Sequence, residues 1–177
     1  MPVLDSLAKP PFSLPSDDIA WVQKTLNGMS AEDKVRQLFV HMAMGDDLAA
    51  IDGLVATRPG GIHRFMGENL ETAWKATRRA VESSEIPLFI TGDLEGGGHG
   101  SIAMTRMTNQ LGLAAANDLE LSAKAVGVLA SEGAAFGYNW SFTPVVDVNR
   151  ETGSAVVGTR SYGSNVDQGL RNNFLNI

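Results

Sequence analysis

The sequence predicts an α/β protein built from about four parallel β/α units, and three features of the chain support this fold class. Short apolar runs without helical spacing, typical of buried strands, occupy residues 38–44, 62–66, 87–91 and 139–148. Segments with helical spacing alternate with these runs and occupy residues 16–28, 46–57, 69–84 and 117–136. Proline and glycine mark many of the boundaries. Because parallel strands need a crossover between them, this alternation indicates a parallel sheet.

The chain divides at its first helix signal. Residues 1–15 contain four prolines and are predicted to form an extended arm, whereas residues 16–177 are predicted to form one partial barrel or sheet domain. Ser16 is placed to cap the first helix of that domain. Ser30 begins a second helix, because Asp33 lies three residues later in a variant of the capping box.

The later elements follow from similar local signals. The segment 69–84 carries charges on one predicted face and, on the other, Leu70, Ala73, Trp74, Thr77 and Val81, which indicates an amphipathic helix. Gly137 is placed to end the helix at 117–136. Pro144 limits the pairing of the last strand, because proline has no backbone N–H to donate.

Composition excludes several classes of function. The 177 residues are 44% hydrophobic and 19% charged, as in ordinary globular domains. A net charge of −6 argues against a nucleic-acid partner, because phosphate backbones are bound by basic patches. The absence of cysteine excludes disulfides and thiolate chemistry. No run approaches the roughly 20 apolar residues of a membrane span, and the N-terminus lacks a leader pattern, so we expect a cytoplasmic protein without membrane contact.

Candidate functional residues lie just after the strands. In open parallel sheets and in closed barrels alike, ligands meet the C-terminal ends of the strands. Asp93 and Glu95 follow the third run in a glycine-rich turn, Asp147 follows the fourth, and Arg160 lies in a later turn. Periodicity does not distinguish an open doubly wound sheet from half of an eight-stranded barrel.

The glycine-rich turn does not have the spacing of a nucleotide-binding loop, and its acidic residues would repel phosphate. His41, His63 and His99 lack metal-ligand spacing, so they are interpreted as hydrogen-bonded polar residues. We therefore expect no metal and no other cofactor.

The polar residues after the strands also have structural interpretations. Asp93 and Glu95 could be read as the paired carboxylates of glycoside hydrolysis, but neighbours on one loop rarely lie on both sides of the bond that is cleaved. Glu95 is therefore expected to brace the glycine turn, while Asp93 alone faces the pocket. Arg160 has two compatible interpretations, an ion pair with an acid such as Asp147 and a donor to sugar hydroxyls. Trp140 is expected in the core, with a sugar-stacking platform as the alternative.

Five sequence blocks in order resemble the N-terminal catalytic domain of glycoside hydrolase family 3, and the similarity runs over about residues 25–167. The blocks are Met29–Phe39, Pro59-Gly60-Gly61-Ile62, Asp93-Leu94-Glu95-Gly96-Gly97, Phe142–Asn149 and Gly158–Ser164. The resemblance implies the first half of a TIM-type (β/α)8 barrel. It also implies a retaining O-glycosyl hydrolase acting on β-linked sugars, and the third and fifth blocks look closer to the β-N-acetylhexosaminidase branch than to the β-glucosidases.

By this resemblance Asp93 binds hydroxyls of the terminal sugar, Arg160 holds the same sugar, and Asp147 braces the pocket. Ser101 stands where many family members carry an arginine, so that sugar contact is missing. The Lys-His-x-Pro-Gly block with its acid/base loop, and the later aspartate nucleophile, have no counterpart in residues 1–177.

We therefore expect no catalytic residue in this chain, which is interpreted as a truncated part of the domain, inactive alone. Its expected partner is a small carbohydrate, and self-association through open barrel edges is a further expectation. The alternative is a non-catalytic carbohydrate-binding or self-assembling half-barrel module.

Overall fold

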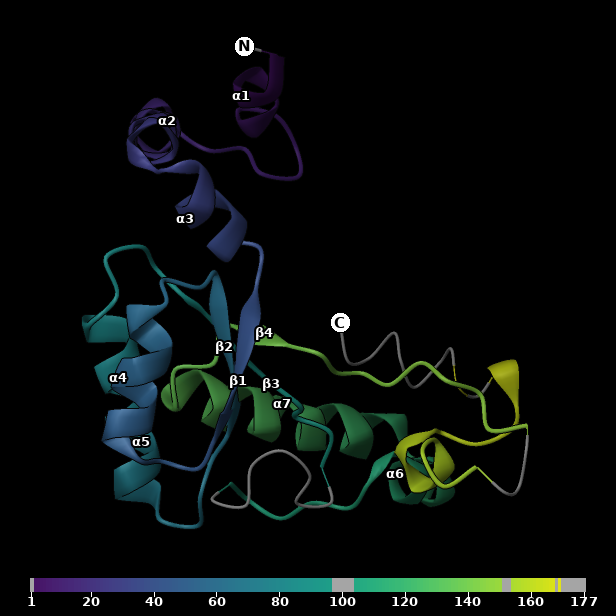
Figure 1. Ribbon diagram of the computed structural model, residues 1–177. Helices are drawn as coiled ribbons and strands as arrows, with labels where there is room; N and C mark the ends of the chain where they lie inside the picture. The colour runs from purple at the N-terminus through teal and green to yellow at the C-terminus, as the bar shows by residue number, and fades with distance from the viewer. Residues whose placement is uncertain (1, 97–103, 151–153, 168, 170–177) are drawn as a thin grey trace.

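The computed structural model describes residues 2–96, 104–150, 154–167 and 169 of the chain. Its centre is a four-stranded sheet in which every neighbouring pair is parallel (Figure 1). The strands are β1 (Val40–Met44), β2 (Gly61–Phe65), β3 (Phe89–Gly92) and β4 (Trp140–Ser141). Their order in the sheet, β1-β2-β3-β4, is the order in the chain. A doubly wound sheet reverses its strand order at a switch point, so this sequential order is that of a half barrel.

The helices are α1 (Pro2–Leu7), α2 (Ser16–Gly28), α3 (Ala31–Arg36), α4 (Leu48–Ala56), α5 (Leu70–Glu82), α6 (Gln110–Ala116) and α7 (Leu119–Ala135), with the 3-10 turn η1 (Gly158–Arg160). In Figure 1, α1, α2 and α3 lie together beyond the amino end of β1, and α4 and α5 lie side by side along the sheet. No helix in the described part of the chain has the length and apolar character that crossing a bilayer requires.

One face of the sheet builds the core. Ile62 of β2 and Ile90 of β3 are fully buried there, and they pack with Ile51 of α4 and with three alanines of α5, Ala73, Ala76 and Ala80. The small alanine side chains let α5 lie close to the strands, and Tyr138 closes the cluster near β4.

The opposite face of the sheet is apolar and largely uncovered. We call this surface the open face, and its exposed members are Val40, Met42, Met44, Phe89, Trp140 and Phe142. The apolar runs predict strands covered on both faces, but only the helix side is covered along the whole sheet. On the other side His63 and Thr91 are buried, whereas β1 is mostly exposed. In a closed barrel the open face is the inner surface, where side chains of the other strands fill the interior. The edges of the sheet are β1 and β4.

Local signals placed most elements, with four corrections. Ser16 was expected to cap the first helix, but Pro15 is the N-cap residue of α2 and no side chain caps this helix. The expected extended arm at residues 1–15 is wrong in its first part, because Pro2–Leu7 forms α1. Proline fits the first helical position, where its missing N–H would have no partner within the helix. The last strand pairs only over Trp140–Ser141, well short of the expected 139–148. Helix α6 was not anticipated. The predicted Ser30 cap is confirmed, since its hydroxyl accepts the Asp33 backbone N–H at 3.0 Å.

Candidate functional site

Asp93 and His63 lie together at the C-terminal edge of the sheet. His63 of β2 pairs in register with Thr91 of β3, so their side chains point to the same face, and Asp93 follows two residues later. The His63 Nε2 atom lies 3.6 Å from Asp93 Oδ2, and its Nδ1 atom lies 2.8 Å from Thr91 Oγ1. The Asp93 side chain is 21% exposed, so it is partly accessible at the C-terminal end of the open face while it stays in contact with His63.

Glu95 and Arg160 form a two-pronged ion pair next to Asp93. Arg160 donates from Nε and from Nη2 to the two carboxylate oxygens of Glu95, each at 2.7 Å. The Glu95 side chain is 3% exposed, whereas that of Arg160 is 36% exposed. Arg160 also donates from Nη1 to the carbonyl of Val156 at 3.3 Å. A guanidinium has five N–H donors, so the described residues use three of them and two remain for a ligand.

Asp93 and Asp147 both lie close enough to the Arg160 guanidinium to attract it electrostatically. Hydrogen bonding to Glu95 raises the pKa of Arg160, and Coulombic attraction to Glu95, Asp93 and Asp147 raises it further, against the opposing effect of burial. Arg160 is therefore a permanently charged donor set among carboxylates. Asp93 and Arg160, which the sequence assigned to one rim, do lie within electrostatic reach of each other.

A buried serine fastens η1 to the segment after β4. The Ser161 hydroxyl donates to the carbonyl of Asp147 at 2.7 Å and accepts the Gly163 backbone N–H at 3.1 Å. Ser161 is nearly fully buried, while Asp147 is exposed. Asp147 therefore contributes its backbone carbonyl to these hydrogen bonds, while its carboxylate remains at the surface near Arg160.

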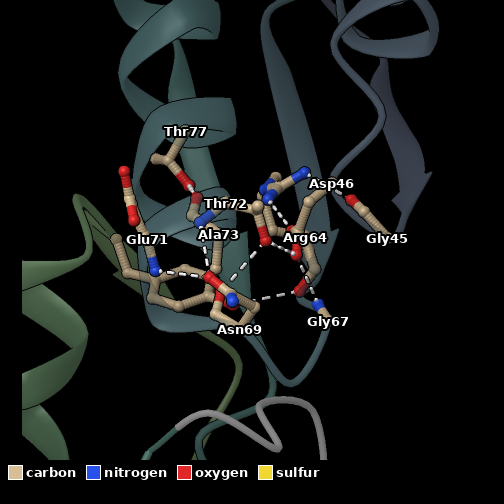
Figure 2. Close-up of polar contacts among 10 residues, drawn as sticks. Gly45, Asp46, Arg64, Gly67, Asn69, Glu71, Thr72, Ala73 and Thr77 are labelled. Carbon is tan, nitrogen blue, oxygen red and sulfur yellow. Dashed lines mark hydrogen bonds and ion pairs between the residues drawn. The ribbon is translucent and has the colours of Figure 1, made fainter.

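A second ion pair lies at the same end of the sheet but has a different character (Figure 2). Arg64 of β2 is fully buried and donates to Asp46 Oδ1 at 2.7 Å and to the carbonyl of Gly45 at 2.8 Å. The other oxygen of Asp46 accepts the Gly67 N–H at 3.0 Å and the Thr72 hydroxyl at 3.3 Å. The pair thus ties the β1–α4 loop to the β2–α5 loop, and its buried guanidinium is not open to a ligand.

The comparisons with known proteins agree with this geometry. The model of the glycosyl hydrolase family 3 N-terminal domain matches residues 30–171. This chain belongs to glycoside hydrolase family 3. A family relative from Cellulomonas fimi, a β-N-acetylglucosaminidase/β-glucosidase, is 34% identical over 164 residues, which cover 89% of this chain and 28% of that protein. The chain therefore spans less than a third of the length of this curated relative.

Solved structures of the family share the fold. The β-glucoside phosphorylase BglX bound to 2FGlc aligns with a TM-score of 0.82 and 27% identity, over 97% of this chain and 32% of that one. A family 3 β-N-acetylglucosaminidase from Paenibacillus sp. str. FPU-7 aligns with a TM-score of 0.67 and 30% identity, over 85% of this chain and 30% of that one. The expected half of a family 3 barrel is confirmed.

The contacts of the site residues agree with some expectations from the sequence and differ from others. Glu95 was expected to brace the glycine turn, most of which lies outside the described residues, and its described partner is Arg160. The expected ion pair of Arg160 with a nearby acid is present, and the acid is Glu95, while Asp147, named as an example, acts by Coulombic attraction. His63 was considered only as a metal ligand or a general polar residue, and no sequence signal placed it beside Asp93. His99 and Ser101 lie outside the described residues.

Proposed function

We propose that this chain supplies the side of a family 3 active site that binds the terminal sugar of a β-linked glucoside or N-acetylglucosaminide. The observation that supports this most directly is the grouping of the Asp93 carboxylate with the Glu95–Arg160 pair at the C-terminal edge of the sheet. A carboxylate accepts hydrogen bonds from two adjacent hydroxyls, and the guanidinium supplies donors to hydroxyl oxygens. Asp93 and Arg160 are the proposed sugar ligands, with Asp147 as a further carboxylate at the rim.

The same grouping supports binding without bond cleavage by this chain alone. Retaining hydrolysis uses two carboxyl groups about 5–5.5 Å apart, one as nucleophile and one as acid/base. Both oxygens of Glu95 accept hydrogen bonds from Arg160, which commits this carboxylate to the ion pair and turns it away from either role. Asp93 then lacks Glu95 as a catalytic partner, so in our proposal cleavage depends on residues that the resemblance places later in the family's sequence.

Calorimetric titration of the 177-residue chain with N-acetylglucosamine and with glucose tests the binding proposal. Asp93→Asn is expected to weaken binding at least about tenfold, because an ionised acceptor is lost. Asp17→Asn is the matched control, since Asp17 is an exposed acid on α2, far from the sheet edge, and this change is expected to leave affinity unchanged. Equal affinities of the two variants would refute the assignment of Asp93.

A turnover assay tests the second part of the proposal. The chain is incubated with an aryl β-N-acetylglucosaminide and an aryl β-glucoside, with and without inorganic phosphate, because one structural relative is a phosphorylase. We expect no release of the aryl group above background. Steady release that follows the chain through purification would show that the residues present suffice for cleavage.

A second candidate function is self-assembly of two half barrels, and the open face favours it. Apolar side chains on a flat surface, flanked by the unpaired edges of β1 and β4, are features of an association site. Light scattering is expected to give a concentration-dependent dimer mass that Met42→Lys abolishes, whereas Leu119→Lys, at an exposed apolar residue of α7, leaves it unchanged. A monomer at every concentration would exclude this candidate.

A further inference from the structure

The imidazole of His63 is fixed in orientation by rings on two sides. The Phe142 ring stacks on it at 5.3 Å between centroids with 7° between the planes, and the Phe65 ring meets it edge-on at 4.7 Å. The side chain is 11% exposed, although it lies on the open face, where Met42 and Phe89 are exposed. A ring packed in this way has little freedom to rotate, so its two nitrogens point in fixed directions.

Those directions determine which nitrogen carries the proton in neutral His63. The Nδ1 atom faces the Thr91 hydroxyl at 2.8 Å, and Thr91 is fully buried. The Nε2 atom faces the Asp93 carboxylate at 3.6 Å. A proton on Nδ1 would leave the lone pair of Nε2 directed at a carboxylate, which is electrostatically unfavourable. If the Thr91 hydroxyl instead donates to Nδ1, the Nε2–H bond points at Asp93, and both contacts are attractive.

We propose that His63 is a positioning residue for Asp93, holding Oδ2 through its Nε2–H group and leaving Oδ1 for a sugar hydroxyl. The inference rests on the proposed function, in which Asp93 binds the terminal sugar. At 3.6 Å the contact is longer than a hydrogen bond, so His63 orients the carboxylate electrostatically and does not use up its acceptor capacity. Thr91 acts behind His63 by fixing its tautomer, as outer partners of functional histidines commonly do.

The tautomer can be measured on the free chain without any sugar. Long-range 1H–15N spectra of the 15N-labelled protein, at a pH where His63 is neutral, identify the protonated nitrogen. We expect protonation at Nε2 in the wild type and a mixture of tautomers in Thr91→Val, which keeps the shape of the side chain and removes the hydroxyl donor. A wild-type ring protonated at Nδ1 would overturn the proposal whether or not the chain binds sugar.

Binding measurements separate positioning from packing. His63→Leu fills similar space without a donor, whereas His63→Gln keeps an N–H group that can reach Asp93. For N-acetylglucosamine we expect His63→Leu to weaken binding about tenfold and His63→Gln to restore most of the affinity. The matched control is His41→Leu on β1, which changes the same residue type one strand away and is expected to leave affinity unchanged.

The outcomes distinguish this inference from the function on which it rests. Equal losses in His63→Leu and His63→Gln would assign His63 a packing role only and overturn the positioning proposal. If the wild-type chain binds neither N-acetylglucosamine nor glucose, the proposed function fails, and the tautomer measurement alone then decides the geometric claim about His63, Thr91 and Asp93.

Discussion

Removing Asp46 is expected to leave a buried charge without its partner. Arg64 is fully buried, and the Asp46 side chain is 10% exposed. Truncating one member of a buried ion pair costs about 3–5 kcal/mol, because the remaining charge loses its partner inside the protein. Asp46→Ala also removes the acceptor for the Gly67 N–H. Since the net stability of a domain is about 5–15 kcal/mol, a loss of about 3–5 kcal/mol is a large part of the total.

Urea unfolding followed by circular dichroism and by tryptophan fluorescence measures this change, and coincident transitions establish two-state behaviour. The double variant Asp46→Ala/Arg64→Met removes both charges and is expected to recover at least half of the loss, because an apolar side chain of similar length needs no ionic partner. Lys124→Met is the matched control. Lys124 forms an exposed pair with Glu120, and such pairs contribute little to stability.

Two results would refute this reasoning. A loss below about 1 kcal/mol in Asp46→Ala would mean that water or another group solvates Arg64 as well as Asp46 does. A double variant less stable than Asp46→Ala would mean that the guanidinium stabilises the loops through its bond to the Gly45 carbonyl, independently of its charge partner.

Three further predictions concern packing, pH and sheet pairing. Gly92→Ala is expected to cost about 1–3 kcal/mol in urea unfolding, because the new Cβ would clash with the ring of buried Tyr138. Hydrogen bonds from the Thr105 hydroxyl and backbone N–H lower the pKa of Glu132, so its stabilising contribution is present above its ordinary pKa of 4.5 and is lost as the pH falls through the lowered value. Thr105→Val is therefore expected to raise the pKa of Glu132, measured by carboxyl 13C titration, and to reduce the stability lost on acidification. Asn139→Ala is expected to cost about 1–3 kcal/mol in thermal or urea unfolding, since this side chain donates to one backbone carbonyl at 2.9 Å and accepts one backbone N–H at 2.8 Å beside β3.

The sequence predicted what depends on local periodicity. The apolar runs placed β1, β2 and β3 to within two residues, because short apolar runs without helical spacing are typical of strands in a parallel sheet. The rule that ligands meet strand ends predicted that Asp93 and Arg160 lie at one rim. The capping signal at Ser30 succeeded because a cap depends on four consecutive residues.

The sequence did not predict what depends on distant contacts. The Glu95–Arg160 pair joins residues 65 positions apart, and Asp147 was an equally reasonable partner by charge. Of the expected face of α5, Ala73 and Thr77 are buried, together with Ala76 and Ala80, whereas the larger Trp74 and Val81 are exposed. Size explains this difference, because only small side chains let the helix lie close to the strands. Trp140 was expected in the core, and it lies exposed on the open face.

The two ion pairs at the C-terminal edge differ in which partner is buried, and this difference separates structure from site. In the Asp46–Arg64 pair the guanidinium is enclosed, and its described hydrogen bonds go to Asp46 and to the Gly45 carbonyl, not to a site open to a ligand. In the Glu95–Arg160 pair the carboxylate is enclosed, so Glu95 fixes a cation that stays partly exposed. An anchored cation loses little conformational entropy when a ligand binds, which is the advantage of preorganisation. The burial of Glu95 is therefore the physical reason to expect that Arg160 binds a ligand at the rim occupied by Asp93.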